Sequence, residues 1–468
     1  MLFPTLSFAL FFLIVFAAHR ATIAHARAHK VLLLVASYWF YGAWDWRFCF
    51  LLLMSSLINY GAGVALRSTD DTRRRKLVLA LGIAANLAIL GFFKYYGFFV
   101  ESLDAALHVL GWQRDLLFLD LILPVGISFF TFQGISYVVD TYRGKLHVAP
   151  GLVDVLLYIS FFPQLVAGPI VRAAHFLPQL TRPPAVATQT TFGLTLIVWG
   201  LFKKVVVATH LAENVVDPVF FDPLGFGTWD VLIATYAYAV QIYCDFSAYS
   251  DIAIGVAALL GFQFPRNFDQ PYRAASLRDF WRRWHISLSS WLRDYLYIPL
   301  GGGRNGAVKT YRNLFITMLL GGLWHGASWQ FIAWGAMHGA GLAVERAVRN
   351  MTGGLFRSWP AVLRIVLVFH FVCAAWVLFR AETFELATDM FAQLRDTSLE
   401  PVMLTPFVLT LTAFGLAMHA FPATVLGAVE RRVARLPVWL QGAVFGLAVI
   451  VVDALGIDGV APFIYFQF

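Results

Sequence analysis

The sequence predicts an all-α, polytopic membrane protein, and its composition, its low charge and its recurring apolar segments indicate this fold class. The 468 residues are 59% hydrophobic and only 13% charged, with a mean hydropathy of +0.70. Soluble domains average about 25% charged residues. No polar stretch is long enough to fold alone, so residues 1–468 are predicted to form one transmembrane domain.

The apolar segments have about the length that spans a bilayer, roughly 20 residues. In order they are 3–19, 30–44, 47–66, 76–99, 116–138, 151–171, 191–211, 229–244, 246–263, 314–344, 360–380, 402–421 and 437–456. About eleven are expected to cross the membrane, with the others re-entrant or interfacial. The first has no basic residue before Arg20, so we expect a retained helix rather than a cleaved signal peptide.

Positive charge lies at the ends of these segments. The basic connections 67–76, 265–313, 346–349 and 431–435 are predicted to face the cytoplasm. The net charge of +8 is explained by these membrane edges and by one substrate-facing loop, so nucleic acid is not an expected partner.

Common catalytic and metal-binding patterns are absent from the sequence. Cys49, Cys244 and Cys373 are far apart, which implies neither a disulfide framework nor a zinc site. Cys244 has no adjacent histidine that would activate it as an acyl-carrying nucleophile. The lack of HExxH, GxSxG and P-loop motifs counts against metalloprotease, serine hydrolase and nucleotidase activities.

Residues 265–313 interrupt the apolar pattern with a charged, aromatic loop. It holds nine Lys or Arg against three Asp, which gives six of the chain's eight net positive charges. Treated as one helix, residues 277–295 place tryptophans and leucines in one arc and a polar stripe beside it. The stripe contains Arg278, Arg282, Ser289 and Arg293. An interfacial amphipathic helix explains the pattern, with His285 on the border as either a functional or an incidental residue.

The arginines of this loop suit a phosphorylated, water-borne molecule, because guanidinium groups match phosphate geometry. The residues concerned are Arg278, Arg282, Arg283 and Arg293. Coenzyme A fits such a site, since its slim pantetheine arm can carry a thioester toward a buried base.

The 31-residue run 314–344 contains no Asp, Glu, Lys or Arg, yet it contains His325. An ionisable group inside a membrane segment is costly and indicates function. Burial disfavours the protonated form, so a neutral imidazole can serve as a general base. A histidine hydrogen-bonded to a neighbouring helix is the structural alternative. His338 is predicted to support helix packing.

Glycines punctuate the same run and predict a break, kink or re-entrant element near His325. They are Gly321, Gly322, Gly326, Gly335 and Gly339.

Asp245 and Asp251 lie in a further apolar stretch. We interpret them as helix caps or as partners of loop arginines, helped by the intervening serines. A proton relay or ion site is the alternative, and it leaves an ion-coupled transporter as a competing function.

Several long motifs resemble the membrane-bound O-acyltransferase family, in the bacterial branch that includes the alginate O-acetylation membrane subunit. The matching stretches are SYWFYGAW, PVGISFFTFQGISYVVDTYR, FFPQLVAGPIVR, IYCDFSAYSDIAIG, FPRNFDQPY, FWRRWHISLSSWLRDYLYIPLGGGRNG, LLGGLWHGASWQFIAWGAMHG and FIYFQF. The resemblance covers nearly the whole chain. It implies a helical bundle around a central tunnel, with 265–313 as a cytoplasmic-side loop and 314–344 carrying the catalytic histidine.

The resemblance also implies roles for individual residues. His325, in LWHGA, is expected to deprotonate a hydroxyl acceptor, and His285, in RWHIS, to position a substrate or stabilise developing charge. Expected substrate contacts are Arg278, Arg282, Trp284, Arg293, Asn267 and Tyr243. No metal and no tightly bound cofactor is expected.

By the same resemblance, the expected donor is acetyl-CoA and the expected location is the inner membrane. The acceptor is an extracytoplasmic polysaccharide, reached directly or through periplasmic acetyltransferase partners. Peptidoglycan, cellulose or teichoic acid as acceptor, with a carrier-bound donor in the last case, are the alternatives within the family.

Overall fold

The computed structural model describes residues 3–112, 118–146, 149–181, 189–304, 306–353, 358–421 and 424–457. Throughout these residues the secondary structure is helical, and no strand occurs among them. The C-terminal FIYFQF motif lies outside the described residues. The chain forms two compact units, one of Met1–Gln189 with Ala257–Phe264 and one of Thr190–Val256 with Pro265–Phe468.

In its described residues the first unit is a set of helices with one π-helical and one 3-10 segment. Its elements are α1 (Leu6–Thr22), α2 (Ala26–Asp45), α3 (Arg47–Arg67), α4 (Thr72–Leu90), η1 (Gly91–Tyr95), α5 (Tyr96–Val109), α6 (Ile127–Tyr142), α7 (Leu152–Ser160), α8 (Phe162–Leu165), α9 (Ala173–Phe176) and η2 (Leu177–Thr181).

The second unit carries the remaining helices. Its elements are α10 (Thr190–Leu201), η3 (Phe202–Ala208), α11 (Thr209–Leu211), η4 (Ala212–Val216), α12 (Asp217–Phe221), η5 (Pro223–Gly225), α13 (Thr228–Leu259, whose last turn belongs to the first unit), η6 (Pro271–Arg273), α14 (Leu277–Arg283), α15 (Ile286–Leu292), η7 (Arg293–Tyr297), α16 (Ala307–His325), α17 (Trp329–Met351), α18 (Ala361–Arg380), α19 (Phe384–Gln393), α20 (Pro406–Ala417), α21 (Thr424–Ala434) and α22 (Val438–Ala454).

Helices long and apolar enough to cross a membrane are present, which confirms the all-α membrane class. In the described part of the chain five stretches qualify: Arg47–Arg67, Thr72–Val109, Thr190–Phe221, Thr228–Leu259 and Ala361–Arg380. Shorter apolar helices are Leu6–Thr22, Pro406–Ala417 and Val438–Ala454.

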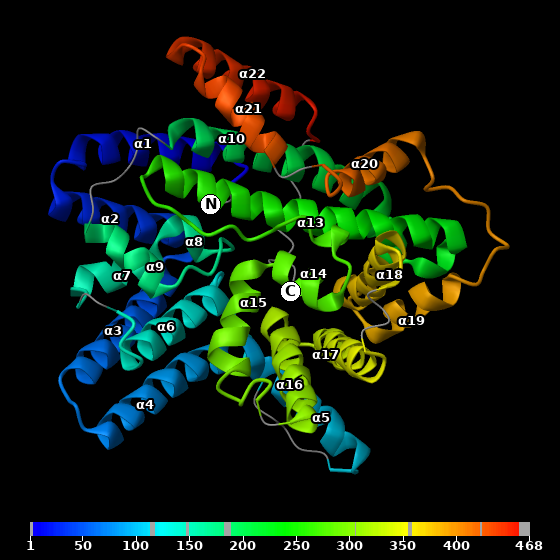
Figure 1. Cartoon of the computed structure of the whole chain (residues 1–468), viewed down its shortest axis with the longest axis horizontal. Helices are drawn as coiled ribbons and strands as arrows, with labels where there is room; N and C mark the ends of the chain where they lie inside the picture. Colours follow the sequence, from blue (N-terminus) through cyan, green and yellow to red (C-terminus); the bar gives the residue numbers. More distant parts are fainter. Residues whose placement is uncertain are drawn as a thin grey trace. The chain divides into compact units, whose positions relative to one another are not determined.

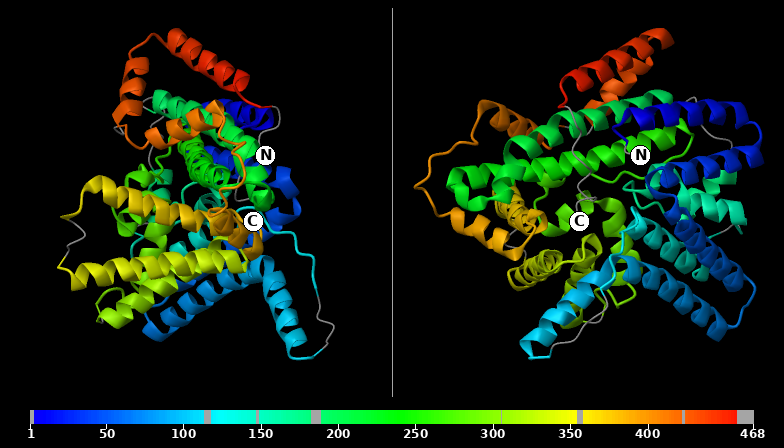
Figure 2. Two further views of the ribbon diagram at one scale, coloured as in Figure 1. Left: turned by 90° about the vertical axis from the view of Figure 1, so that its right-hand side faces the viewer. Right: turned by 180° about the vertical axis from the view of Figure 1, so that it is seen from behind.

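Helices α3 and α4 form an antiparallel pair in the first unit, drawn in blue in Figures 1 and 2. The amides of Asn59 and Asn86 donate to each other's carbonyl oxygens at 3.1 and 2.9 Å. Gly134 of α6 packs on this amide pair, where an added Cβ would lie only 2.5 Å from Asn59 Nδ2. The buried amides therefore satisfy each other in the interior.

Two predicted segments of the first unit are less helical than expected. Within 116–138 the helix α6 begins only at Ile127, after Pro124 and a left-handed Gly126 with φ 77°. Within 151–171, α7 ends at Ser160 ahead of Pro163. Proline and left-handed glycine interrupt a helix, and they outweigh apolar composition here.

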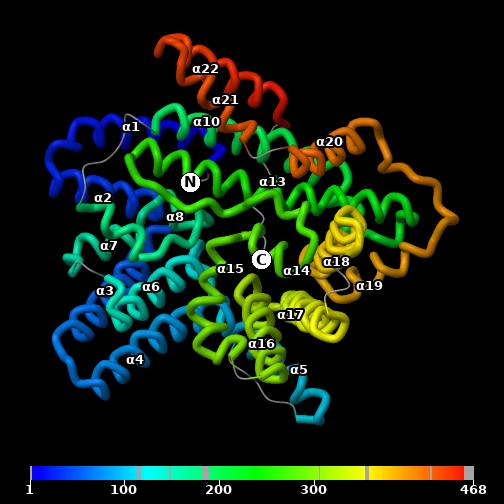
Figure 3. Tube along the Cα trace, viewed as in Figure 1, coloured from blue at the N-terminus to red at the C-terminus, as the bar shows by residue number. Residues whose placement is uncertain are grey.

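The predicted spans 229–244 and 246–263 are one continuous helix, so the prediction of two segments was wrong. Figure 3 shows α13 running without interruption. Asp245 and Asp251 sit inside it and are ion-paired to lysines of η3. Because these partners neutralise the carboxylates, the charges do not force a turn.

The run 314–344 is divided between α16 and α17, which form an antiparallel hairpin (Figure 1). Helix α16 ends at His325, Gly326 is extended, and α17 begins at Trp329. An added Cβ at Gly322 would clash with the carbonyl of Phe331, and one at Gly335 would lie 2.5 Å from Met318 O. Glycine thus permits the close approach of the two helices, and the predicted break is confirmed.

Candidate active site

His285 lies at a backbone break and not inside a helix. Helix α14 ends at Arg283 and α15 begins at Ile286, so the single helix predicted for 277–295 was wrong. His285 itself is left-handed, with φ 42° and ψ 57°. Such a conformation costs a non-glycine residue on the order of 1–3 kcal/mol and is held only by surrounding structure.

Asn267 supplies that surrounding structure. Its backbone oxygen accepts from Ile286 N at 2.8 Å. Its side-chain oxygen accepts from Ser287 N at 3.1 Å, from the Ser287 hydroxyl at 2.8 Å and from His285 Nδ1 at 3.3 Å. Its amide nitrogen donates to Ser250 Oγ of α13 at 3.0 Å. The predicted site residue Asn267 therefore fixes the position of His285.

These hydrogen bonds favour one tautomer of His285. The Asn267 oxygen can only accept, so a proton on His285 Nδ1 completes the 3.3 Å hydrogen bond and leaves Nε2 as an acceptor, while the Ser287 hydroxyl lies 3.4 Å from Nδ1. Nε2 is buried and has no hydrogen-bond partner among the described residues. Burial lowers the pKa of His285 to about 3. The ring is therefore neutral at physiological pH and presents one free lone pair.

His325 is the last residue of α16 and is 4% exposed. Its ring contacts Trp324, Trp334 and Phe379, with ring centroids 5.0, 5.0 and 5.2 Å away. Trp324 also contacts the His285 ring at 6.0 Å. The two predicted catalytic histidines, 40 residues apart in sequence, thus both contact one tryptophan.

Two other residues predicted to contact substrate, Trp284 and Tyr243, both contact the ring of Phe268. The Phe268 ring stacks on His285 at 6.4 Å and contacts Trp284 at 5.1 Å and Tyr243 at 6.1 Å. Trp284 is 1% exposed. Trp284 and Tyr243 are therefore linked to His285 through the Phe268 ring, which contacts all three residues.

The predicted arginine group divides into two sets. Arg283 pairs with Asp279 at 3.0 Å, and Arg293, in η7, pairs with Asp294 at 2.6 Å. The exposed guanidinium groups of Arg278 and Arg282 remain together on α14. Burial lowers the pKa of Arg278, and the nearby charge of Arg282 lowers it further. The predicted stripe that included Arg293 was wrong, because the chain breaks at His285.

Sequence reasoning missed two basic residues of this cluster. Arg349 and Arg346 of α17 also lower the pKa of Arg278. Glu345 joins the two helices, because its carboxylate accepts from Leu277 N at 2.5 Å. The signal was present in the sequence: the uncharged run ends directly before these residues. The cluster carries concentrated positive charge at the α14 end of the hairpin.

Asp245 and Asp251 neither cap helices nor pair with loop arginines, so that interpretation was wrong. Lys203 Nζ lies 2.7 Å from Asp251 and donates to Ser247 Oγ at 2.7 Å. Lys204 Nζ lies 2.8 Å from Asp245. Each carboxylate therefore has its own cation, supplied by the π-helical segment η3.

Metal-binding potential is low in the part of the chain that the structure describes. No group of three or more His, Cys, Asp or Glu side chains there could hold a metal ion. The three cysteines are free thiols, and Cys244 and Cys373 are buried.

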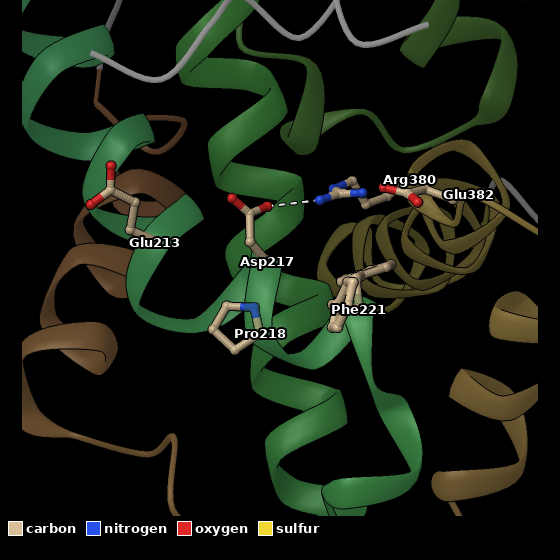
Figure 4. A pocket seen from close by; sticks show the side chains of 7 residues that line it. Glu213, Asp217, Pro218, Phe221, Arg380 and Glu382 are labelled. Atoms are coloured by element: carbon tan, nitrogen blue, oxygen red, sulfur yellow. Dashed lines mark hydrogen bonds and ion pairs between the residues drawn. The ribbon is translucent and has the colours of Figure 1, made fainter. Parts of the chain in front are cut away.

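A pocket of about 440 Å³ lies in the same unit, beside the C-terminal end of α18 (Figure 4). Arg380 and Asp217 form an ion pair in it at 2.8 Å. Further lining residues are Glu213, Pro218, Phe220, Phe221 and Glu382. The residue before Arg380 is Phe379, whose ring contacts His325. The pocket is therefore close to the hairpin tip, but neither predicted catalytic histidine lines it.

Known proteins of similar sequence include probable alginate O-acetylases and a peptidoglycan O-acetyltransferase. The chain is 43% identical over 371 residues to a probable alginate O-acetylase of Azotobacter vinelandii, covering 78% of this chain and 72% of that protein. It is 40% identical over 468 residues to a probable alginate O-acetylase of Pseudomonas putida, covering 94% and 95%. It is 38% identical over 385 residues to a peptidoglycan O-acetyltransferase of Helicobacter pylori, covering 76% and 72%.

The sequence model of the membrane-bound O-acyltransferase family matches residues 145–386, which include both histidines and the arginine cluster. The helical architecture and the apolar spans fit a membrane enzyme of this kind. The chain belongs to the membrane-bound O-acyltransferase (MBOAT) family and is an O-acyltransferase.

Proposed function

We propose that this enzyme transfers acetyl groups from cytosolic acetyl-CoA, across the inner membrane, for O-acetylation of an extracytoplasmic polysaccharide of the alginate type. The proposal rests mainly on two buried imidazoles, those of His285 and His325, that both contact Trp324. The names of the similar alginate O-acetylases support the choice of acetyl group and polymer. We further propose that His325 and His285 are the catalytic residues.

The orientation of the hairpin supports entry of the donor from the cytoplasm. Both open ends of the hairpin are basic, with Lys309 and Arg312 on α16 and Arg346 and Arg349 on α17. The positive-inside rule places these ends in the cytoplasm. Helix α16 is about 28 Å long, so His325 lies at the end of the hairpin far from these basic residues. His325 at the tip then faces the acceptor side.

The donor binds through its phosphates to the arginine cluster, because Arg278 and Arg282 are exposed and lie beside Arg346 and Arg349. Arg293 has a smaller role, since Asp294 already occupies its guanidinium. Acetyl-CoA is a substrate that leaves after each turnover and not a bound cofactor.

In the chemical step His325 removes the proton from the acceptor hydroxyl, and the oxygen attacks the thioester carbonyl. The carbon–sulfur bond breaks, and the departing thiolate takes the proton from the His325 imidazolium. The products are an O-acetyl ester and free coenzyme A. His285 Nε2, an acceptor in its assigned tautomer, positions a substrate hydroxyl or amide N–H. Asn267 holds His285 in place, while Trp284 and Tyr243 shape the wall around it.

We also propose that about eleven spans surround a central tunnel in which donor and acceptor meet. The family match runs from residue 145 to 386 and so includes parts of both compact units, which supports one transmembrane domain over 1–468. The pocket beside Arg380, near the hairpin tip, is suited to the acceptor side. Periplasmic acetyltransferase partners complete delivery to the polymer where the acceptor is indirect.

Mass spectrometry of surface polysaccharide tests this function. A deletion strain and a His325→Ala strain are compared with wild type for acetyl content and sugar backbone, and the tagged protein is quantified in membranes. We expect loss of acetyl groups in both strains at unchanged protein level. Normal acetylation in the His325→Ala strain would rule out the histidine as the base. Loss of acetyl groups from peptidoglycan instead would favour the acceptor of the Helicobacter relative.

An ion-coupled transporter is not favoured. Asp245 and Asp251 are each neutralised by a lysine at 2.7–2.8 Å, so they do not form an open carboxylate site for a cation.

A further inference from the structure

Two stretches of the second unit form a strongly acidic surface. Residues 213–222 and 380–400 together hold eight Asp or Glu against two Arg, a net charge of −6 in a chain whose overall net charge is +8. The two stretches lie side by side, because Arg380 pairs with Asp217 at 2.8 Å and α19 contacts both α12 and η5. We term this surface the acidic pole.

The acidic pole lies at the extracytoplasmic ends of three candidate spans. Thr190–Phe221 and Ala361–Arg380 end there, and Thr228–Leu259 begins beside it. The other end of Thr228–Leu259 leads into the basic loop 265–313, and Ala361–Arg380 follows the basic residues 346–349. The positive-inside rule places those basic ends in the cytoplasm. Because Asp and Glu contribute little to membrane orientation, topology does not account for the negative charge of the pole.

The pocket beside Arg380 is a recess in the acidic pole (Figure 4). Three carboxylates line it, and Arg380 pairs with that of Asp217. Glu213 and Glu382 are exposed and form no ion pair among the described residues. Phe221, which is 80% exposed, adds an aromatic ring to the lining. Carboxylates beside an aromatic ring suit a cationic side chain, above all the planar guanidinium of arginine.

The acidic pole is joined to the hairpin tip by two contacts. Gln330, in the first turn of α17, donates its side-chain amide to the backbone oxygen of Glu382 at 2.7 Å. Phe379, directly before the acidic stretch, contacts the ring of His325 at 5.2 Å. A molecule bound at the acidic pole is therefore held near the proposed base.

We propose that the acidic pole binds a basic face of the extracytoplasmic acetyltransferase partner, with a cationic side chain in the pocket beside Arg380; this inference rests on the proposed function. Complementary charge steers association and suppresses partners of like charge. Alginate is a polyuronate and therefore anionic, so the acidic pole repels the polymer and attracts a basic protein. The partner and not the polymer occupies this surface.

Fluorescence anisotropy of the purified full-length enzyme in an uncharged detergent tests the proposal. The probe is a labelled peptide of alternating arginine and glycine. Glu213→Gln combined with Glu382→Gln should weaken its binding about fivefold, because each exposed ion pair contributes modestly. The difference from wild type should vanish at high salt, which screens exposed charges.

Helix α5 offers a matched control. Glu101→Gln combined with Asp104→Asn removes the same charge from exposed positions outside the acidic pole, and this variant should bind the peptide as the wild type does. Thermal unfolding of both double variants checks that they are folded.

Equal affinity of the peptide for wild type and for the Glu213→Gln, Glu382→Gln variant would overturn the proposal, and so would an equal loss in the α5 control. A labelled oligouronate is the second probe. If it binds in a calcium-dependent way that the Glu213→Gln, Glu382→Gln variant loses, the polymer occupies the surface and the proposal is wrong. Peptide binding requires no turnover, so an enzyme that binds the peptide but never uses acetyl-CoA would contradict the proposed function instead.

Discussion

Two groups of buried polar side chains in the second unit differ in how completely they are paired. Between η3 and α13, each carboxylate meets a lysine at 2.7–2.8 Å, as in the Lys204–Asp245 pair. Around Trp324 and Trp334, by contrast, His285 and His338 keep ring nitrogens without partners among the described residues. Paired charges hold helices together, and unpaired nitrogens are available to a substrate. Whether a buried polar group has a partner therefore distinguishes structural residues from proposed catalytic residues better than the degree of burial does.

Removing the base should have the largest effect. General-base catalysis contributes on the order of 10²–10⁴-fold, so His325→Ala should lower acetyl transfer by that factor while the protein still inserts and folds. Acetyl-CoA turnover in purified membranes measures it. If the His325→Ala enzyme kept more than a tenth of wild-type turnover, the side chains around Trp324 and Trp334 would no longer be distinguished by function from the ion pairs of η3 and α13.

Breaking one ion pair should affect folding more than chemistry. Lys204→Met removes the cation that lies 2.8 Å from the buried Asp245 carboxylate, and breaking a buried ion pair in this way costs about 3–5 kcal/mol. We expect a large drop in folded protein, measured by thermal unfolding in detergent. Lys204→Met combined with Asp245→Leu should recover most of the stability, because an apolar pair of similar volume is often neutral.

The recovered double variant is also the control for the transporter alternative. Its turnover per folded molecule should be close to wild type. If it folds normally and has lost all acetyl transfer, the Lys204–Asp245 pair takes part in function and the comparison fails.

Releasing His285 from Asn267 should have an intermediate effect. Asn267→Leu removes the acceptor for His285 Nδ1 and for Ser287 N. The ring then loses its fixed tautomer, and kcat should fall about tenfold. Asn267→Asp keeps an acceptor oxygen and should recover part of the rate. An equal loss in both variants would show that Asn267 acts only in packing.

The smallest effect is expected on the KM for acetyl-CoA, and it should differ between the exposed arginines of α14 and the ion-paired Arg293. Arg278→Gln and Arg282→Gln each should raise the KM for acetyl-CoA several-fold, because each removes a charge-assisted hydrogen bond to phosphate. Arg293→Gln should change it less than twofold, since Arg293 pairs with Asp294. Steady-state kinetics at two salt concentrations measures this. A larger KM change in Arg293→Gln would reverse the assignment.

Local sequence patterns predicted much of this arrangement. The apolar length of the spans, the glycine-marked break and the placement of His325 at that break all depend on residues close in sequence. Long-range contacts were not predictable in the same way. The left-handed His285 depends on Asn267, 18 residues away, and the Asp251 charge is met by Lys203, 48 residues away. Periodicity assumed a continuous helix where tertiary hydrogen bonds impose a break.

In the proposed reaction a thioester from the cytoplasmic side and a hydroxyl from the opposite side meet at His325. Proteoliposomes with the enzyme in one known orientation test it directly, with labelled acetyl-CoA supplied to one face and acceptor to the other. We predict labelled ester only when acetyl-CoA contacts the face bearing Arg278 and Arg282, and none with His325→Ala. Equal labelling from either face, or labelling that survives His325→Ala, would show that the two substrates do not meet at His325 from opposite faces.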